Sequence, residues 1–445
     1  MSENNGKKDI WIVKLDAFGN LIWEHSYGGS ENEKAYDIEQ TSDGGYIVIG
    51  ISESNDFNGI TGHNGYEDIV VLKLDSSGVL EWGKFHGSSS YNDRGLSIEQ
   101  TADGGYIAAG LVGVDGNGFD FWIAKLTNLG EIDSNWANTI YGGQYNDAAH
   151  DVTKTSDGGY VAAGFAKYGI PGVGIETDFW IKKFDSNGNV EWDQLLGGTG
   201  TDVAQTIYQT SDGGYIVAGT TRSNDGHVTN YHGKSDIWVV KLDNMGDLEW
   251  QRALGGSDDE EATSIFQTLD GNYVISGFTE SIDGDISYSI ASNLVKDFWV
   301  IKLDPNGNII WDKSLGGSIE EYNYSAQQTN DGGYILAGTS NSNDFDVSGS
   351  NGYYDFWVVK LDGESLNIDD NNFKSEVSIF PNPTNGKVMV QSNKSIQSIH
   401  VFSLLGKCVI VTTNNEINLS GYPTGVYIVE INTEQASLIK RIIEN

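Results

Sequence analysis

Short apolar runs separated by Gly- and Asp-rich turns recur along the first 363 residues of this 445-residue chain. One run follows an Asp-Gly turn six times, as "GYIVIG" at 45 and "GYIVAG" at 214, and another, "DIWIVKLD" at 9, recurs six more times at spacings of 59, 52, 58, 58, 61 and 58 residues. The runs are short and rich in Val, Ile, Tyr and Trp, which favours strands over helices. A period near 58 residues indicates a repeat architecture.

Each repeat offers four short strands, which we name A to D. In one repeat they are "AQTIYQT" (A), "GYIVAG" (B), "DIWVVKLD" (C) and "LEWQRAL" (D). The "SDGG" between A and B supplies the residues of a tight hairpin turn. Four antiparallel strands in a repeat of this length predict an all-β fold, a β-propeller of four-stranded blades followed by a small β-sandwich domain. The strand order resembles that of kelch-type blades, which would make strand A the innermost.

Strand C occurs seven times, whereas strands A, B and D each occur six times. We therefore expect six complete blades in this chain and an intact parent of seven, in which an upstream segment supplies a further D, A and B. In the alternative with six blades, strand D at 20–27 serves as the outer strand of the last blade. Either arrangement would leave few sheet edges exposed.

The net charge of −37 disfavours nucleic acid and anionic membranes as partners. Residues 374–445 carry six Lys or Arg and five Asp or Glu, which sum to +1 and leave −38 on residues 1–373. The single cysteine, Cys408, excludes an intramolecular disulfide framework. No apolar run reaches the length of a membrane span. The composition predicts a secreted, β-rich monomer with a domain boundary where the charge changes.

The sequence after that boundary contains ordered motifs, from "FPNPTNGK" through "LLGK" to "LSGYPTGVYIVEI". It resembles the type A C-terminal sorting domain of the type IX secretion system of Bacteroidota. The residues that carry the resemblance are Phe380, Pro381, Asn382, Pro383, Gly386, Gly406, Lys407, Gly425, Tyr427, Lys440 and Arg441. The resemblance implies a small β-sandwich that engages the secretion machinery and is usually removed after export.

This organisation divides the chain into a propeller at 1–363, a linker at 364–373 and a sorting domain at 374–445. The protein is then expected outside the cell or on the outer-membrane surface. The start "MSENNGKKDIWIVK" has no apolar signal-peptide core, which we interpret as an incomplete N-terminus. A cytoplasmic protein with a relic tail is the alternative.

Catalytic signatures are absent: the chain has no G-x-S-x-G, H-E-x-x-H, P-loop or dinucleotide-binding motif. Its seven His are scattered, and all twelve Trp fall at repeat positions in strands C and D, as expected of blade core. The Lys of strand C repeats in the same way and predicts a structural pair with a carboxylate. We expect a non-catalytic protein, with a glycan-active hydrolase or lyase at the channel as the alternative.

The B–C loops differ in every repeat and share one face with the D–A turns. Variable loops on a rigid scaffold are where recognition is usually found, so we expect a glycan or a protein to bind there. The candidate binding residues are Asp56, Asp115, Asp225, Asp283, Asp285, Asp344 and Asp346.

A carboxylate stands at the start of strand A in each of six repeats. These residues are Glu33, Asp93, Asp147, Asp202, Glu260 and Glu321. If strand A is innermost, the six would gather round one mouth of the channel, where Ca²⁺ could relieve their repulsion. The alternative role is to cap N–H groups of the Gly-rich D–A turn.

Overall fold

The computed structural model describes residues 4–444 except 90, 115–117, 137–138, 171–173, 288–294, 351, 364–376, 381–383, 385, 393–394, 404–407, 424 and 434–436. These residues form strands and turns, and none of them lies in a helix that is long and apolar enough to cross a membrane. The chain separates into two compact units. One holds Met1–Asn330 and Tyr334–Leu361, and the other holds Asp331–Gly333 and Asp362–Asn445. The predicted linker at 364–373 lies outside the described residues.

The first unit consists of consecutive antiparallel sheets, which we number as blades. Blade 1 contains β3 (Glu33–Gln40), β4 (Tyr46–Ser52), β5 (Asp68–Leu74) and β6 (Leu80–His86). Blade 2 contains β7 (Arg94–Gln100), β8 (Tyr106–Val114), β9 (Gly118–Leu126) and β10 (Ile140–Tyr141). Blade 3 contains β11 (Ala148–Lys154), β12 (Tyr160–Ile170), β13 (Gly174–Phe184) and β14 (Val190–Leu196).

The next blades repeat this order. Blade 4 contains β15 (Asp202–Gln209), β16 (Tyr215–Thr221), β17 (Asp236–Leu242) and β18 (Leu248–Leu254). Blade 5 contains β19 (Glu260–Gln267), β20 (Tyr273–Thr279), β21 (Asp297–Leu303) and β22 (Ile309–Leu315). Blade 6 contains only β23 (Glu321–Gln328), β24 (Tyr334–Ser340) and β25 (Asp355–Leu361). A separate hairpin of β1 (Ile10–Leu15) and β2 (Leu21–Tyr27) precedes blade 1.

This count corrects one expectation from the sequence. Five blades have four strands, and the sixth lacks the outer strand that the sequence assigned to residues 20–27. Those residues form β2, which pairs with β1 from Ile10 opposite Tyr27 to Leu15 opposite Leu21. The six-blade closure is therefore wrong, because the local turn "DAFGN" joins β1 and β2 into a hairpin of their own. The all-β propeller class with four-stranded antiparallel blades is confirmed.

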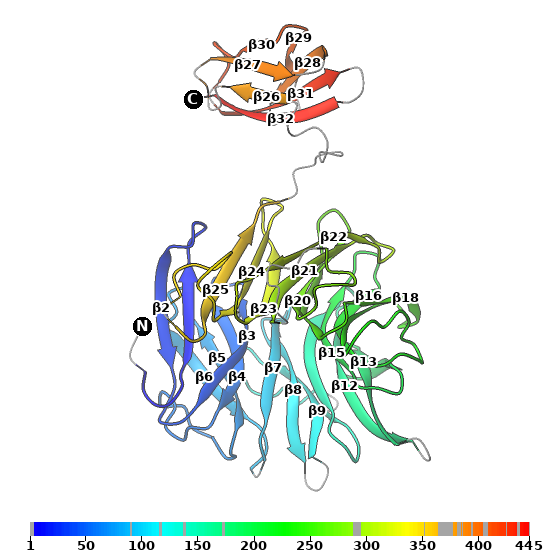
Figure 1. Ribbon diagram of the computed structural model, residues 1–445. Coiled ribbons are helices and arrows are strands. Elements are labelled where there is room, and N and C mark those ends of the chain that lie inside the picture. Colours follow the sequence, from blue (N-terminus) through cyan, green and yellow to red (C-terminus); the bar gives the residue numbers. More distant parts are fainter. Residues whose placement is uncertain are drawn as a thin grey trace. The chain divides into compact units, whose positions relative to one another are not determined.

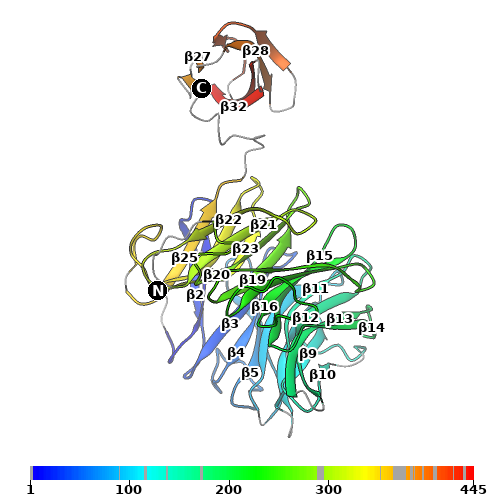
Figure 2. The ribbon, with the colours of Figure 1, turned by 45° about the vertical axis from the view of Figure 1, so that its right-hand side comes forward.

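Successive blades lie side by side (Figures 1 and 2), and the side-chain core lies between them. Strands B and C of blades 1 to 5 are buried on both faces. In blade 4, for example, Val217 and Val240 contact blade 3, while Ile216 and Val239 contact blade 5. This explains why these strands read as continuous apolar runs. Burying an aliphatic side chain contributes about 1.5–3 kcal/mol, so the stacked faces supply most of the stability of the unit.

The Lys of strand C has the structural role that its repetition predicted. Lys241 is buried, and its ammonium lies 3.1 Å from Asp212 of the A–B turn and 3.0 Å from Glu249 of strand D. Lys73 and Lys183 make the same two pairs in their own blades. One ammonium thus ties three segments of a blade together.

The second unit contains two sheets around its own core. One sheet holds β26 (Val377–Phe380), β27 (Lys387–Ser392) and β30 (Glu416–Asn418). The other holds β28 (Ile396–Ser403), β29 (Cys408–Thr412), β31 (Gly425–Thr433) and β32 (Ser437–Glu444). Alternate residues of the facing strands, such as Val388, Val390, Val429 and Ile431, form the core, as the pattern of "KVMVQS" and "VYIVEI" predicts.

Candidate functional site

The acids at the start of strand A are buried caps of the D–A turn. Glu33, Asp93, Asp147, Asp202, Glu260 and Glu321 are each at most 3% exposed. In blade 5, the Gly256 N–H donates to Glu260 Oε2 at 2.8 Å and the Thr279 hydroxyl donates to Oε1 at 2.7 Å. The Gly29, Gly143, Gly198 and Gly317 N–H groups donate in the same way to the acids of their blades. One carboxylate therefore joins the D–A turn to its blade.

The aspartates of the B–C loops hold the same turn from its other side. The Ser30 N–H donates to Asp56 Oδ1 at 2.9 Å, and the Ser257 N–H donates to Asp283 Oδ1 at 2.8 Å. Asp225 and Asp344 accept the equivalent N–H groups of Thr199 and Ser318.

Two residues further along these loops, the first Gly of the turn is the donor. The Gly255 N–H donates to Asp285 at 3.2 Å and the Gly316 N–H to Asp346 at 3.4 Å. Six of the seven predicted loop residues thus fix the base of the loop face. The seventh, Asp115, lies outside the described residues.

Each capping acid faces a second carboxylate, from the first residue of strand C in the preceding blade. The Oδ1 atoms of Asp9, Asp68, Asp120, Asp178 and Asp297 are buried and find no donor among the described residues. A Cβ on Gly28 would clash with both Asp9 and Glu33, and one on Gly316 with both Asp297 and Glu321, so this close approach requires glycine. Burial, and then the charge of Glu321, raises the pKa of Asp297 to about 7. Burial raises the pKa of Asp147 and of Asp178 to about 6.

The capping acids were expected to gather round one channel mouth, and this stays a prediction. Each is sequestered at its own blade junction, and the described residues contain no cluster of three or more His, Cys, Asp or Glu with the arrangement of a metal site. Binding of Ca²⁺ at the carboxylate pairs stays a prediction. The recurring Asp at the start of "DIWVVKLD" was the sequence signal for these pairs, which sequence reasoning missed.

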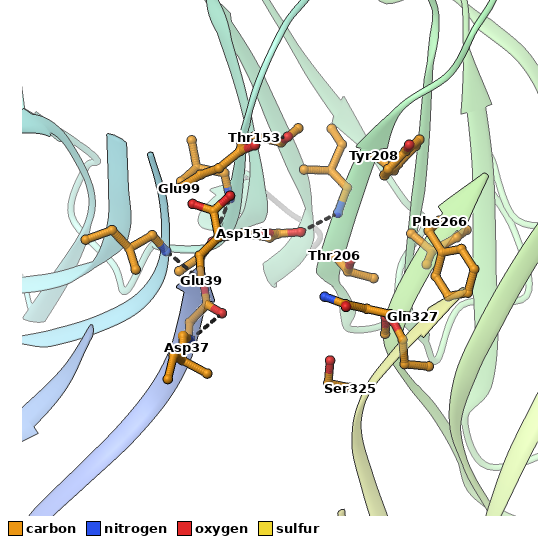
Figure 3. Close-up of a pocket in the computed structure, with 18 of the residues that line it drawn as sticks. Asp37, Glu39, Glu99, Asp151, Thr153, Thr206, Tyr208, Phe266, Ser325 and Gln327 are labelled. Atoms are coloured by element: carbon orange, nitrogen blue, oxygen red, sulfur yellow. Dashed lines mark hydrogen bonds between the residues drawn. The ribbon is translucent and has the colours of Figure 1, made fainter. Parts of the chain in front are cut away.

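The six innermost strands line a channel cavity of about 460 Å³ (Figure 3). A register shift interrupts strand A in every blade, for instance between Ala149 and Asp151, and such bulges re-aim the residues that follow. One ring of lining residues consists of Asp37, Ser97, Asp151, Thr206, Ser264 and Ser325. The next consists of Glu39, Glu99, Thr153, Tyr208, Phe266 and Gln327. The acids thus come only from blades 1 to 3.

The channel acids also tie neighbouring blades together. Asp37 Oδ2 accepts the Ile98 N–H at 2.8 Å, and Asp151 Oδ2 accepts the Ile207 N–H at 2.8 Å. Burial, and to a smaller extent the charge of Asp151, raises the pKa of Asp37 to about 7, and burial raises that of Asp151. These acids were not among the predicted site residues, although Asp and Glu occur at these strand A positions only in the first three repeats.

Exposed aromatic side chains mark the loops of two blades. Tyr66 of blade 1 is 76% exposed, and Phe345 and Tyr353 of blade 6 are 70% and 89% exposed. All three belong to the B–C loops, whose aspartates accept hydrogen bonds from the D–A turns. Aromatic side chains are enriched where proteins meet their partners.

The sorting-motif residues lie in the second unit. Phe380 ends β26, Gly425 and Tyr427 lie in β31, and Lys440 and Arg441 lie in β32. The Tyr427 side chain is buried, and its hydroxyl donates to the Pro423 carbonyl at 2.6 Å. Gly386 has a φ of 126°, in the region that favours glycine. Pro381, Asn382, Pro383, Gly406 and Lys407 lie outside the described residues.

Comparison with known sequences finds two matches. Residues 378–445 match the secretion system C-terminal sorting domain. Over 215 residues, the chain is 26% identical to the regulatory protein FlaEY of Caulobacter vibrioides, which covers 46% of this chain and a fifth of that protein.

Comparison with solved structures finds weaker likenesses. PorZ, an essential surface component of the type IX secretion system of Porphyromonas gingivalis, is 13% identical with a TM-score of 0.38, covering 92% of this chain and 52% of its own. A protein of unknown function from Dyadobacter fermentans is 11% identical with a TM-score of 0.46, covering 81% and 99%. The family match identifies the C-terminal unit: residues 378–445 are a type IX secretion sorting domain, carried behind a β-propeller.

Proposed function

We propose that this protein is a non-catalytic binding propeller, exported by its sorting domain, that recognises a glycan or a protein through the face formed by its B–C loops and D–A turns. The supporting observation is a contrast within this face: the hydrogen bonds at its base recur, whereas the sequences of its B–C loops differ. The base is fixed by the same hydrogen bonds in several blades, through Asp56, Asp225, Asp283 and Asp344. The remaining residues of the B–C loops differ in sequence from blade to blade.

The exposed aromatic residues are the contact groups in this proposal. Tyr66, Phe345 and Tyr353 offer flat apolar faces, and Tyr also offers a hydroxyl, so they suit sugar rings and protein side chains. Rigid aromatic anchors give contact area at a low cost in conformational entropy. The aspartates of the loops act as positioning residues beneath them.

The proposal is tested with glycan arrays and pull-downs on the full chain, followed by titration of any ligand found. Tyr66→Ala and Tyr353→Ala should each weaken binding about tenfold, the loss of about 1.4 kcal/mol of contact. Phe18→Ala is the matched control, because Phe18 is an exposed aromatic residue in a C–D turn on the opposite face. Equal affinities of all three variants would contradict the proposal.

One observation favours a second candidate, a hydrolase or lyase at the channel. Asp37 and Asp151 are the acids in a ring whose other members are Ser or Thr, and a carboxyl with a pKa near 7 suits general acid or base chemistry. Against this, both carboxylates already accept a backbone N–H. Hydrolysis of a polysaccharide panel by the full chain, abolished in Asp37→Asn, would support this candidate over the first.

A further inference from the structure

Blade 6 exposes the face that every other blade buries against its neighbour. Phe356 is 60% exposed and Val358 is 45% exposed, whereas the equivalent pair of blade 5, Phe298 and Val300, is fully buried. The equivalent residues of blades 1 to 4 are fully buried too: Ile69, Val71, Phe121, Ile123, Phe179, Ile181, Ile237 and Val239. The sequence of β25 is thus typical of a strand that is buried on this face, but in the structure this face is only partly buried.

The β1–β2 hairpin covers only part of this face. Trp11 of β1 stacks on Phe356 with ring centroids 5.0 Å apart, and Figure 1 shows the blue hairpin beside the yellow β25. The contact joins the same positions as Phe298–Trp357 and Phe179–Trp238, each between successive blades at 4.6 Å. The hairpin therefore occupies the strand C and strand D positions of the blade that would follow blade 6.

The opposite wall shows the same gap at the inner strand. Ile38 of β3 is 45% exposed, whereas its equivalents Ile98, Val152, Ile207, Ile265 and Ala326 are 2–5% exposed. The Ile98 and Ile207 N–H groups donate to an acid of the preceding blade. The Ile38 N–H instead donates to its own neighbour, Asp37 Oδ1, at 2.8 Å. Among the described residues, nothing occupies the position of a preceding strand A.

Two strand edges border the gap. Within the described residues β1 pairs only with β2, and β25 pairs only with β24. In blade 4 the corresponding strand C, β17, is paired on both sides, with β16 and β18. A strand B can therefore add to the inner edge of β1, and a strand D to the outer edge of β25.

We propose that this gap is a docking slot for one polypeptide segment with the strand D, A and B pattern of these repeats. Its strand D pairs with β25, and its A–B hairpin fills the space between Val358 and Ile38 with strand B against β1. Its apolar faces take the roles that Val217 and Ile216 have in blade 4. The continuity of the slot with five formed blade interfaces specifies a strand-forming peptide rather than another ligand.

The probe is a synthetic peptide with the sequence of residues 190–221, which contains strand D of blade 3 followed by strands A and B of blade 4. Calorimetry with the full chain should show one site with a dissociation constant on the order of micromolar. Hydrogen exchange of β1 and β25 should slow on binding, because their free edges become paired. A peptide with Ile207→Asp and Val217→Asp should not bind, because both side chains belong to the face that packs on a neighbouring blade.

Variants of the chain locate the site. Val358→Asp should weaken peptide binding about tenfold or more, because a charge would be buried without a partner. Leu269→Asp, at an exposed A–B turn position, should leave binding unchanged. Absence of binding, equal binding by the Val358→Asp and Leu269→Asp chains, or a dimer of the chain that Val358→Asp dissociates would each overturn the proposal.

Discussion

Trp11 and Phe356 lie in parallel stacked planes, with ring centroids 5.0 Å apart and 8° between the planes. One residue belongs to the first strand of the propeller unit and the other to its last. The Trp11 indole N–H also donates to Glu24 of β2 at 3.0 Å. This contact holds the hairpin against blade 6.

Trp11→Ala should lower the free energy of unfolding by about 1–2 kcal/mol. Removal of an aromatic side chain from a full core costs about 3–5 kcal/mol, and Phe356 is only partly covered. Denaturant unfolding measures the change, with Phe18→Ala as the exposed control in the same hairpin. If both variants unfolded at the same denaturant concentration, the Trp11–Phe356 stack would not stabilise the propeller unit.

The capping carboxylates provide a second prediction. Glu260→Ala should lower the free energy of unfolding by about 2–3 kcal/mol, because it leaves the Gly256 N–H and the Thr279 hydroxyl without their acceptor. Glu260→Gln keeps one acceptor oxygen and should cost less. Equal losses in the two variants, measured by thermal unfolding, would contradict this account, because Gln keeps both the side-chain volume and one acceptor oxygen.

Stability should depend on pH in two opposite directions. The pKa values of Asp37 and Asp297 are raised from 3.8 to about 7, so between these values the folded state binds more protons than the unfolded state. Their contribution to stability therefore falls as pH rises through that window. The Thr41 hydroxyl and then Lys73 lower the pKa of Asp43 to about 2, so its contribution is present above 3.8 and lost as pH falls towards 2.

The melting temperature should thus be highest at about pH 4 to 6. The loss of net negative charge near the pI of 4.2 acts in the same direction. Asp37→Asn should flatten the decline towards pH 8. A melting temperature that rises steadily to pH 8 would contradict the assignment of neutral carboxyls to the folded state.

Calcium distinguishes the two roles of the acids at the start of strand A. Since each carboxylate already accepts a turn N–H, the capping role predicts that millimolar Ca²⁺ leaves the melting temperature of the metal-stripped protein unchanged. A concentration-dependent rise would instead show that the carboxylate pairs exchange a proton for the cation. Mg²⁺ at the same concentrations is the control for ionic strength.

The sequence predicted the strands because the repeat presents the same pattern six times, and the buried Lys241 follows from its recurrence in every strand C. It did not predict that strand D at residues 20–27 would pair locally with β1, because pairing partners depend on the competition between a short turn and a distant edge. The loop aspartates were predicted as binding residues, which stays a prediction, and their hydrogen bonds to the turn are visible only in the structure. The channel acids were missed because bulges, which a pattern of alternation does not show, aim them inward.

Export by the sorting domain decides whether the propeller can act as proposed, because binding to an outside partner requires the propeller to leave the cell. The direct measurement is protease accessibility on whole cells of a type IX-competent host, comparing the full chain with a chain that lacks residues 374–445. The full chain should be cleaved by protease at the cell surface or found in the medium, and the truncated chain should stay protected in the periplasm. A truncated chain that still reached the surface would contradict export by the sorting domain.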